Sequence, residues 1–314
     1  MMIKNFFKNH PIHKKIVIHL DLFNLLNPLN YFLIWVLLSV GMYLGLFVLN
    51  QSPQFIATFQ YKVFFLYAGI SVIMSSHYID LELSHEKNNS SIKFIKEKYS
   101  VKFIEKTKTY LNFIGLIFLF FSFWINFAIG LILFFFNKSV CKFYLDKRVA
   151  LKLIYQILIA FIISISGYLF SLKDYQLLHF IPLYFKLIVP YLFLYFSVFV
   201  VLNSKIFDSK ISKSIVSVGL LLIIFGILLS LKFQDPLAST SLVVSAPFFL
   251  YTLIRGLDKD FRRVYIYPLA ILNFFCMTIF PYLFIASIVV FYLMKYYNWH
   301  RFDLHFPTFL VEND

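Results

Sequence analysis

The sequence contains few of the residues on which disulfide-rich and metal-binding proteins depend. Its two cysteines, Cys141 and Cys276, lie far apart and form no Cys-x2-Cys pair. We therefore expect neither a structural disulfide nor a zinc site. The eight histidines are scattered and form none of the repeated histidine boxes that a membrane di-iron enzyme needs. We discount that class of enzyme and expect His77 and His85 to lie at a membrane interface.

Charge is also scarce, since charged residues make up 14% of the 314 residues and hydrophobic residues make up 61%. Soluble domains are nearer half apolar. The charges occur in clusters, and the runs between clusters are about twenty residues long, which is enough to cross a hydrocarbon core about 30 Å thick. The composition predicts a polytopic helical membrane protein that is embedded in the lipid bilayer.

Acidic residues are fewer than basic ones, and the formal net charge is +14. The distribution of the basic residues argues against a nucleic-acid partner, because 23 of the 29 lie in segments on one side of the membrane if the N-terminus is cytoplasmic. Short loops rich in Lys and Arg face the cytoplasm. We therefore expect the N-terminus, the long polar connections and any site for polar substrates to be cytoplasmic.

Nine apolar segments are expected to form the membrane spans, at 29–50, 58–76, 105–122, 124–139, 150–172, 182–203, 213–232, 237–254 and 264–297. The last segment would be about 50 Å long as one helix. Pro268 and Pro281 could break it, so it is either one kinked helix or a hairpin, which gives nine or ten spans. Lys295 and Arg301 favour a cytoplasmic C-terminus and therefore ten.

These spans divide the chain into three regions. Residues 1–28 are expected to form a cytoplasmic or interfacial leader, 29–297 the transmembrane domain and 298–314 an interfacial tail. The leader is basic but lacks the short apolar core and the small-residue cleavage site of a signal peptide.

Two polar stripes follow the pattern Ser-x3-Asp-x3-Ser at the cytoplasmic ends of the second and sixth spans. Residues four apart share a helix face. The stripes are separated by 128 residues, or four spans, which indicates two four-helix pseudo-repeats. The simpler interpretation is that each stripe is only the solvated polar end of a membrane helix. The stripes are Ser76, Asp80 and Ser84, and Ser204, Asp208 and Ser212.

In span order and in the position of these stripes, the chain resembles the UbiA superfamily of intramembrane prenyltransferases. That family has about nine helices and two motifs similar to Asn/Asp-x3-Asp-x3-Asp, at the cytoplasmic ends of helices 2 and 6. The segment LNPLNYFL (26–33) resembles the Arg-Pro start of the family's first helix, with Asn27 in place of arginine. The segment CKFYLDKR (141–148) lies where the family has a Tyr- and Lys/Arg-containing segment that helps to hold a diphosphate.

The resemblance implies an all-α polytopic bundle of nine or ten transmembrane helices that moves a polyprenyl group from a prenyl diphosphate to an acceptor. Asp80 and Asp208 would be catalytic, and each would hold Mg²⁺, which neutralises the charge that builds on the leaving diphosphate. The residues implied in diphosphate binding are Asn27, Ser76, Ser84, Lys142, Lys147, Arg148, Ser204, Lys205 and Ser212.

The chain departs from the family pattern because four of its six motif positions are serine. Serine is neutral and cannot replace the charge of a carboxylate, which Mg²⁺ prefers. Lysines near the second stripe, such as Lys205 and Lys210, could instead bind diphosphate directly as point charges. The alternative function is therefore a catalytically impaired relative that binds prenyl or anionic lipid or supports a partner enzyme.

The basic segment after the fourth span has a simpler interpretation too, as a positive cuff that contacts anionic lipid. A transporter has less support, because no acid or base lies in the middle of an expected span to couple transport. The residues select no particular acceptor, prenyl chain length, oligomeric state or protein partner.

Overall fold

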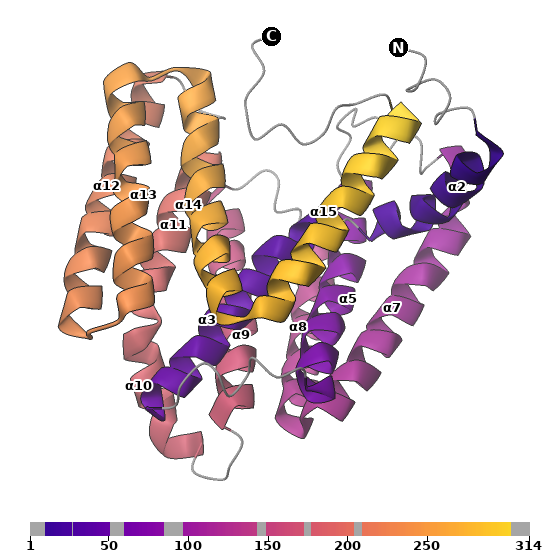
Figure 1. Cartoon of the computed structure of the whole chain (residues 1–314), viewed down its shortest axis with the longest axis horizontal. Coiled ribbons are helices and arrows are strands. Elements are labelled where there is room, and N and C mark those ends of the chain that lie inside the picture. The colour runs from indigo at the N-terminus through magenta and orange to yellow at the C-terminus, as the bar shows by residue number, and fades with distance from the viewer. Residues whose placement is uncertain are drawn as a thin grey trace.

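The computed structural model describes residues 10–26, 28–50, 60–84, 97–142, 149–172, 177–203 and 209–302, and every regular element in these ranges is a helix (Figure 1). This confirms the prediction of an all-α chain. The helices are α2 (Pro11–Leu25), η1 (Pro28–Asn30), α3 (Tyr31–Val48), α5 (Tyr61–Ser84), α7 (Val101–Ser122), α8 (Trp124–Lys142), α9 (Val149–Leu172), α10 (Leu177–Leu187), α11 (Val189–Asn203), α12 (Ser209–Lys232), α13 (Pro236–Arg255), α14 (Asp258–Ile279) and α15 (Pro281–Phe302).

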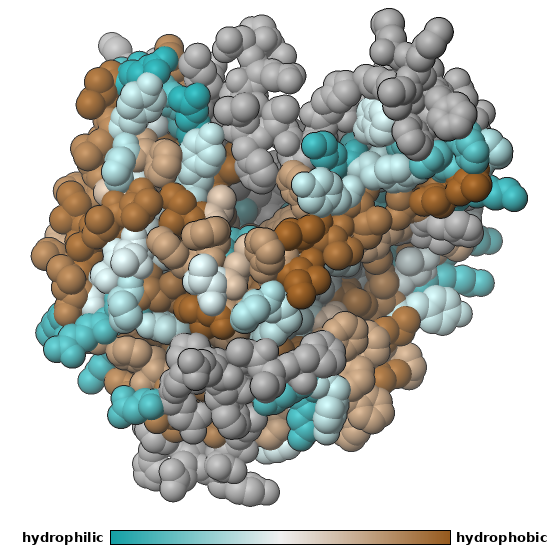
Figure 2. Space-filling model, viewed as in Figure 1, coloured by the Kyte–Doolittle hydropathy of each residue, from teal (hydrophilic) through white to brown (hydrophobic). Residues whose placement is uncertain are grey.

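Five of these helices are long and apolar enough to cross a membrane: α3, α5, α9, α12 and α13. The bent pair α10 and α11, which meet at 46°, makes a sixth if it is one span. Apolar side chains cover the outer face of α12 and α13, and polar ones gather at the two ends of these helices (Figure 2). These helices are typical of a membrane protein, and the count of nine or ten spans stays a prediction.

Helix α3 lies at the centre of the bundle and is buried along most of its length. It crosses α9 so closely that a Cβ atom on Gly41 would lie 1.9 Å from the carbonyl oxygen of Ser164. From the other side, a Cβ atom on Gly167 would lie 2.3 Å from the carbonyl oxygen of Leu38. Small residues at helix crossings are how membrane helices gain van der Waals contact. Glycine is therefore required at both positions.

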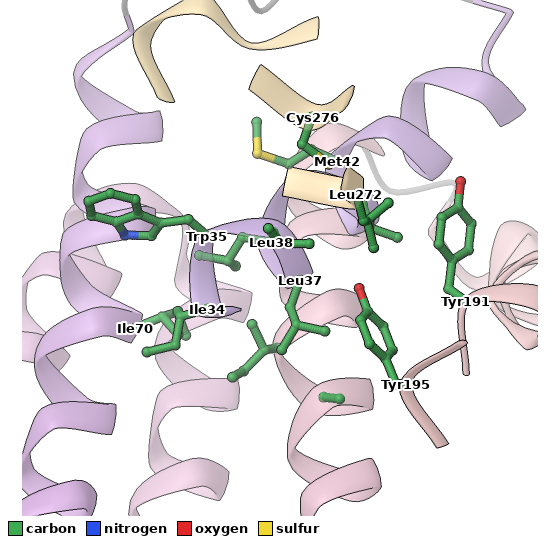
Figure 3. Close-up of a cluster of buried hydrophobic side chains, with 14 of the residues drawn as sticks. Ile34, Trp35, Leu37, Leu38, Met42, Ile70, Tyr191, Tyr195, Leu272 and Cys276 are labelled. Atoms are coloured by element: carbon green, nitrogen blue, oxygen red, sulfur yellow. The ribbon is translucent and has the colours of Figure 1, made fainter. Parts of the chain in front are cut away.

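The apolar core surrounds α3 (Figure 3). Side chains of α3 point outward to α5 on one side and to α11 and α14 on the other. Figure 3 labels Ile34, Trp35, Leu37, Leu38 and Met42 of α3 with Ile70 of α5, Tyr191 and Tyr195 of α11, and Leu272 and Cys276 of α14.

Three buried hydrogen bonds join α3 to the antiparallel α5 in a regular ladder. They link Tyr31 to Ser75 at 2.8 Å, the indole nitrogen of Trp35 to Ser71 at 3.0 Å, and Ser39 to Tyr67 at 2.6 Å. The members are four residues apart on both helices, which keeps them on one face of each. This ladder fixes the rotation of α5 and so decides which of its polar residues face away from α3.

The long apolar stretch 264–297 divides at Phe280. Helix α14 ends at Ile279, and α15 begins at Pro281, which has the φ angle of a first helical residue and no N–H to satisfy. The chain reverses at this point, and α14 and α15 diverge from the turn (Figure 1). The break agrees with the hairpin alternative rather than with one kinked helix.

The first and last described helices, α2 and α15, are joined by a buried ionic cluster that we call the terminal clasp: Asp21 of α2, Lys98, and Tyr297 and Arg301 of α15. Asp21 is fully buried. Its Oδ1 accepts hydrogen bonds from the Tyr297 hydroxyl at 2.9 Å and from Arg301 Nε at 3.0 Å. Its Oδ2 pairs with Lys98 and with the Arg301 guanidinium. The N-terminal segment therefore docks on the end of α15.

Candidate functional site

A cavity of about 520 Å³ lies between α5, α7 and α8 near the C-terminal end of α5. We call it the polar cavity. Its apolar lining comes from Ile73, Phe113, Leu116 and Phe134. Its polar lining comes from Ser76, His77, Lys108, Thr109, Asn112, Asn137 and Lys138.

Ser76, the first residue of the first predicted stripe, lines this cavity. The α3–α5 ladder occupies the face of α5 that carries Ser71 and Ser75, and Ser76 lies about 100° further round the helix. It therefore faces α7, where its Oγ accepts a hydrogen bond from Asn112 Nδ2 at 2.8 Å. Ser76 is buried, so its hydroxyl belongs to the protein interior and not to a solvated helix end.

His77 forms the inner end of a hydrogen-bonded chain that crosses three helices. Its Nε2 bonds the hydroxyl of Tyr155 on α9, and that hydroxyl donates to Asn137 Oδ1 on α8 at 3.0 Å. Since the Tyr155 proton goes to Asn137, the remaining lone pairs can accept the Nε2–H of a neutral imidazole. Asn137 Nδ2 in turn lies 3.7 Å from the sulfur of Met74. His77 is only 2% exposed, so its ring is enclosed by protein, and its predicted depth at the membrane interface stays a prediction.

Two lysines give the polar cavity its charge. Lys108 of α7 and Lys138 of α8 both line it, and the other described polar side chains of its lining are neutral hydroxyls, amides and an imidazole. Lysine ammonium groups with neutral hydrogen-bond donors suit a phosphate group, which accepts hydrogen bonds and carries negative charge. Among the described side chains, no group of three or more His, Cys, Asp or Glu could hold a metal ion. These lining residues fit a phosphate better than they fit Mg²⁺, which prefers carboxylates.

The backbone places two more predicted residues on the Ser76 face. Helix α5 continues through Ser84, so Asp80 and Ser84 lie one and two turns beyond Ser76 on the same face. The side chains of Asp80 and Ser84 are not among those the structure describes. Lys142 follows Lys138 by one turn at the end of α8, and its side chain is likewise not described.

The second predicted stripe is divided between segments. Helix α11 ends at Asn203 and α12 begins at Ser209, so Ser212 belongs to the helix that follows the sixth span. The remaining predicted site residues lie outside the described residues, so the pairing of the two stripes around one cavity stays a prediction. They are Asn27, Lys147, Arg148, Ser204, Lys205 and Asp208.

The sequence predicts only Ser76 among the residues that line this cavity. The predicted diphosphate-binding residues do not include Lys108 or Lys138, and the polar stripes do not include Asn112, Asn137 or Tyr155. A usable signal was present, since an amide inside an apolar helix is costly unless it is paired. Asn112 and Asn137 each interrupt such a segment.

The chain matches no family model, no curated protein and no solved structure. The similarity to intramembrane prenyltransferases therefore remains a hypothesis that depends on span order and on the two stripes.

Proposed function

We propose that the protein binds the phosphate-bearing headgroup of a membrane lipid, of the prenyl diphosphate type, in the polar cavity. The observation that carries this proposal is the convergence of Lys108 and Lys138, from neighbouring helices, on a cavity whose deeper wall is neutral and hydrogen-bonding. The volume of about 520 Å³ is in the range of small-molecule sites. A bound diphosphate would interact with both lysine ammonium groups and would at the same time accept hydrogen bonds from the amide and hydroxyl donors.

Burial of the deeper wall supports anion binding in a second way. Asn112 and Asn137 are held by Ser76 and Tyr155, so the wall is ordered before a ligand arrives. A preorganised site loses less entropy on binding. Charge interactions in such a partly enclosed cavity are also screened less by salt than those on an open surface.

A second candidate function is the transfer of the prenyl group, and the position of Asp80 favours it. Asp80 lies one turn beyond Ser76, a lining residue of the polar cavity, on the same face of α5. We propose that Asp80, together with Asp208 from the second stripe, would hold Mg²⁺ between protein and diphosphate. When bound, Mg²⁺ would neutralise charge on the departing diphosphate. Lys108 and Lys138 would position the same group.

We further propose that the N-terminus and the polar cavity face the cytoplasm and that α14 and α15 both cross the membrane, for ten passes. The counts of Lys and Arg in the loops support the orientation. The terminal clasp supports an even number of passes, because Arg301 at the end of α15 bonds Asp21 of the N-terminal helix. Cysteine-labelling from either side of sealed vesicles tests this topology.

Binding of a labelled prenyl diphosphate to the purified protein in neutral-lipid nanodiscs tests the main proposal. In the presence of EDTA we expect saturable binding, and inorganic diphosphate should displace the labelled ligand. Lys108→Gln and Lys138→Gln should each weaken binding roughly tenfold, because each removes a charge-assisted hydrogen bond. Lys106→Gln is the matched control, since Lys106 is an exposed lysine on the same helix outside the cavity lining. Unchanged affinity in both lining variants would refute the proposed site.

The same preparation separates binding from transfer. With Mg²⁺ and a mixture of acceptor classes, release of pyrophosphate that disappears in Asp80→Asn would support prenyl transfer. Binding without turnover for every chain length supplied would leave the protein as a lipid-binding relative of the enzymes it resembles.

A further inference from the structure

A second cavity, of about 450 Å³, lies between α3, α14 and α15. We call it the hairpin cavity, because α14 and α15, which diverge from their turn at Phe280 (Figure 1), supply most of its lining. Its lining is apolar, with Phe32 and Val36 of α3 and Phe291 of α15 among its members, apart from two residues, Asn273 and Ser287. It shares no lining residue with the polar cavity.

The two polar residues of the hairpin cavity each carry a buried oxygen without a hydrogen-bond partner: Asn273 Oδ1 and Ser287 Oγ. Ser287 is 3% exposed. A buried helical serine commonly bonds the carbonyl four residues earlier, as Ser245 bonds that of Ser241 at 2.6 Å. Leaving a buried polar group unpaired is costly. Two such groups in one apolar cavity therefore mark the place of a ligand's polar group.

The chemistry of these two groups selects the kind of ligand. A hydroxyl can donate to Asn273 Oδ1 and at the same time accept the proton of Ser287 Oγ. A carbonyl would satisfy Ser287 and leave Asn273 Oδ1 unpaired, and a plain hydrocarbon would satisfy neither. A charged headgroup would meet no opposite charge, because none of the lining side chains is charged.

We propose that the hairpin cavity binds a lipid-soluble alcohol, an apolar chain that carries a single hydroxyl, with the hydroxyl between Asn273 and Ser287. The cavity volume lies in the range of small-molecule sites. The proposal does not depend on the function of the polar cavity, because no lining residue belongs to both.

The test is photolabelling in nanodiscs with a long-chain alcohol that carries a diazirine, compared with its methyl ether. An ether oxygen can accept a hydrogen bond but cannot donate one. We expect saturable labelling of α14 and α15 by the alcohol, with roughly fivefold to tenfold weaker labelling by the ether. Asn273→Leu should weaken labelling by the alcohol by a similar factor and leave labelling by the ether unchanged. Ser287→Ala should weaken labelling by both probes, because the ether oxygen can still accept the hydrogen bond from Ser287.

Three variants complete the design. Thr278→Ala removes a hydroxyl from α14 that bonds the Phe275 carbonyl and lies outside the cavity lining, so it should not change labelling. Ala270→Phe fills the cavity and should abolish labelling by both probes. Ser287→Ala removes an unpaired group, so the melting temperature of the ligand-free protein should not fall, which shows that the variant is folded.

Equal labelling by the alcohol and its ether, or equal labelling of wild type and both polar variants, would overturn the proposal. The hairpin cavity would then be a groove for bilayer acyl chains. Lys108→Gln should leave alcohol labelling unchanged, so failure at one cavity is distinguishable from failure at the other.

Discussion

Replacing Asp21 with asparagine should release α2 from α15. The carboxylate is fully buried and accepts from Tyr297, Arg301 and Lys98. Asparagine has almost the same volume but no charge, and its NH₂ group would face the two cations. The substitution therefore removes the terminal clasp without opening a cavity.

The expected loss of stability follows from the burial of the partners. Breaking a buried ion pair by removing one partner costs about 3–5 kcal/mol. The Lys98 and Arg301 side chains are 29% and 27% exposed, so both cations can regain some water and the cost should be near the lower limit. About 3 kcal/mol corresponds to a fall of roughly 5 °C in melting temperature for a chain of 314 residues, if α2 unfolds with the rest of the protein.

The loss should depend on pH in a defined direction. Burial alone raises the pKa of the Asp21 carboxyl, but hydrogen bonds from Arg301, Lys98 and Tyr297 outweigh it and hold the pKa below its usual value. A lowered carboxyl pKa stabilises the folded state above the unfolded pKa, about 3.9, and that contribution is lost as the pH falls through the folded pKa. The difference between wild type and Asp21→Asn should be constant from neutral pH to about pH 5 and shrink below about pH 4.

Thermal unfolding in nanodiscs across this pH range is the assay, with limited proteolysis of α2 as a local readout. Arg301→Gln and the double variant with Asp21→Asn complete a double-mutant cycle. The double variant should lose clearly less stability than the sum of the losses in the two single variants. Glu105→Gln is the control, because Glu105 is an exposed carboxylate on α7. A change in melting temperature below about 1 °C with no new cleavage in α2, or a difference that does not vary with pH, would refute the reasoning.

Two further predictions concern the bundle. Gly41→Ala should lower the melting temperature strongly, because the new Cβ would lie 1.9 Å from the Ser164 carbonyl oxygen. Gly226→Ala should change it little, because the new Cβ would meet only side-chain carbons, those of Leu242 at 3.1 Å or more and Phe193 Cβ at 3.5 Å. Burial raises the pKa of the Asp235 carboxyl, so the folded wild type loses stability when this group gives up its proton. The melting temperature of Asp235→Asn should therefore rise relative to that of the wild type as the pH increases above about 4. Melting curves of purified variants across pH test both.

The helices could be predicted from the sequence because hydropathy and charge report directly on the bilayer. Eight of the nine predicted spans overlap a described helix, or the pair α10 and α11, and the ninth, 264–297, divides into parts of α14 and α15. The break in the last stretch was left as one of two alternatives. Pro281 allows a helix to start there, but only the packing of α15 decides that it does. The spacing of the second stripe predicted a shared helix face less well, because α12 begins between Ser204 and Ser212.

The candidate site was only partly predictable, for a physical reason. Ser76 could be singled out from its spacing to Asp80, which is local information along one helix. Its partner Asn112 lies on another helix, and the rotation of α5 that brings them together is set by the ladder with α3. Such contacts depend on which faces meet in three dimensions, and a periodic pattern within one helix does not contain that information.

The terminal clasp also has a consequence for the synthesis of the protein. Asp21 and Arg301 are separated by 280 residues, which a ribosome needs roughly 15–60 s to add at about 5–20 residues per second. Throughout that time the Asp21 carboxylate lacks the guanidinium of Arg301, and α2 lacks the part of its docking surface that α15 supplies. Closure of the two ends is therefore expected to be among the last steps of membrane assembly. A chain that ended before Arg301 would keep α2 without this ion pair.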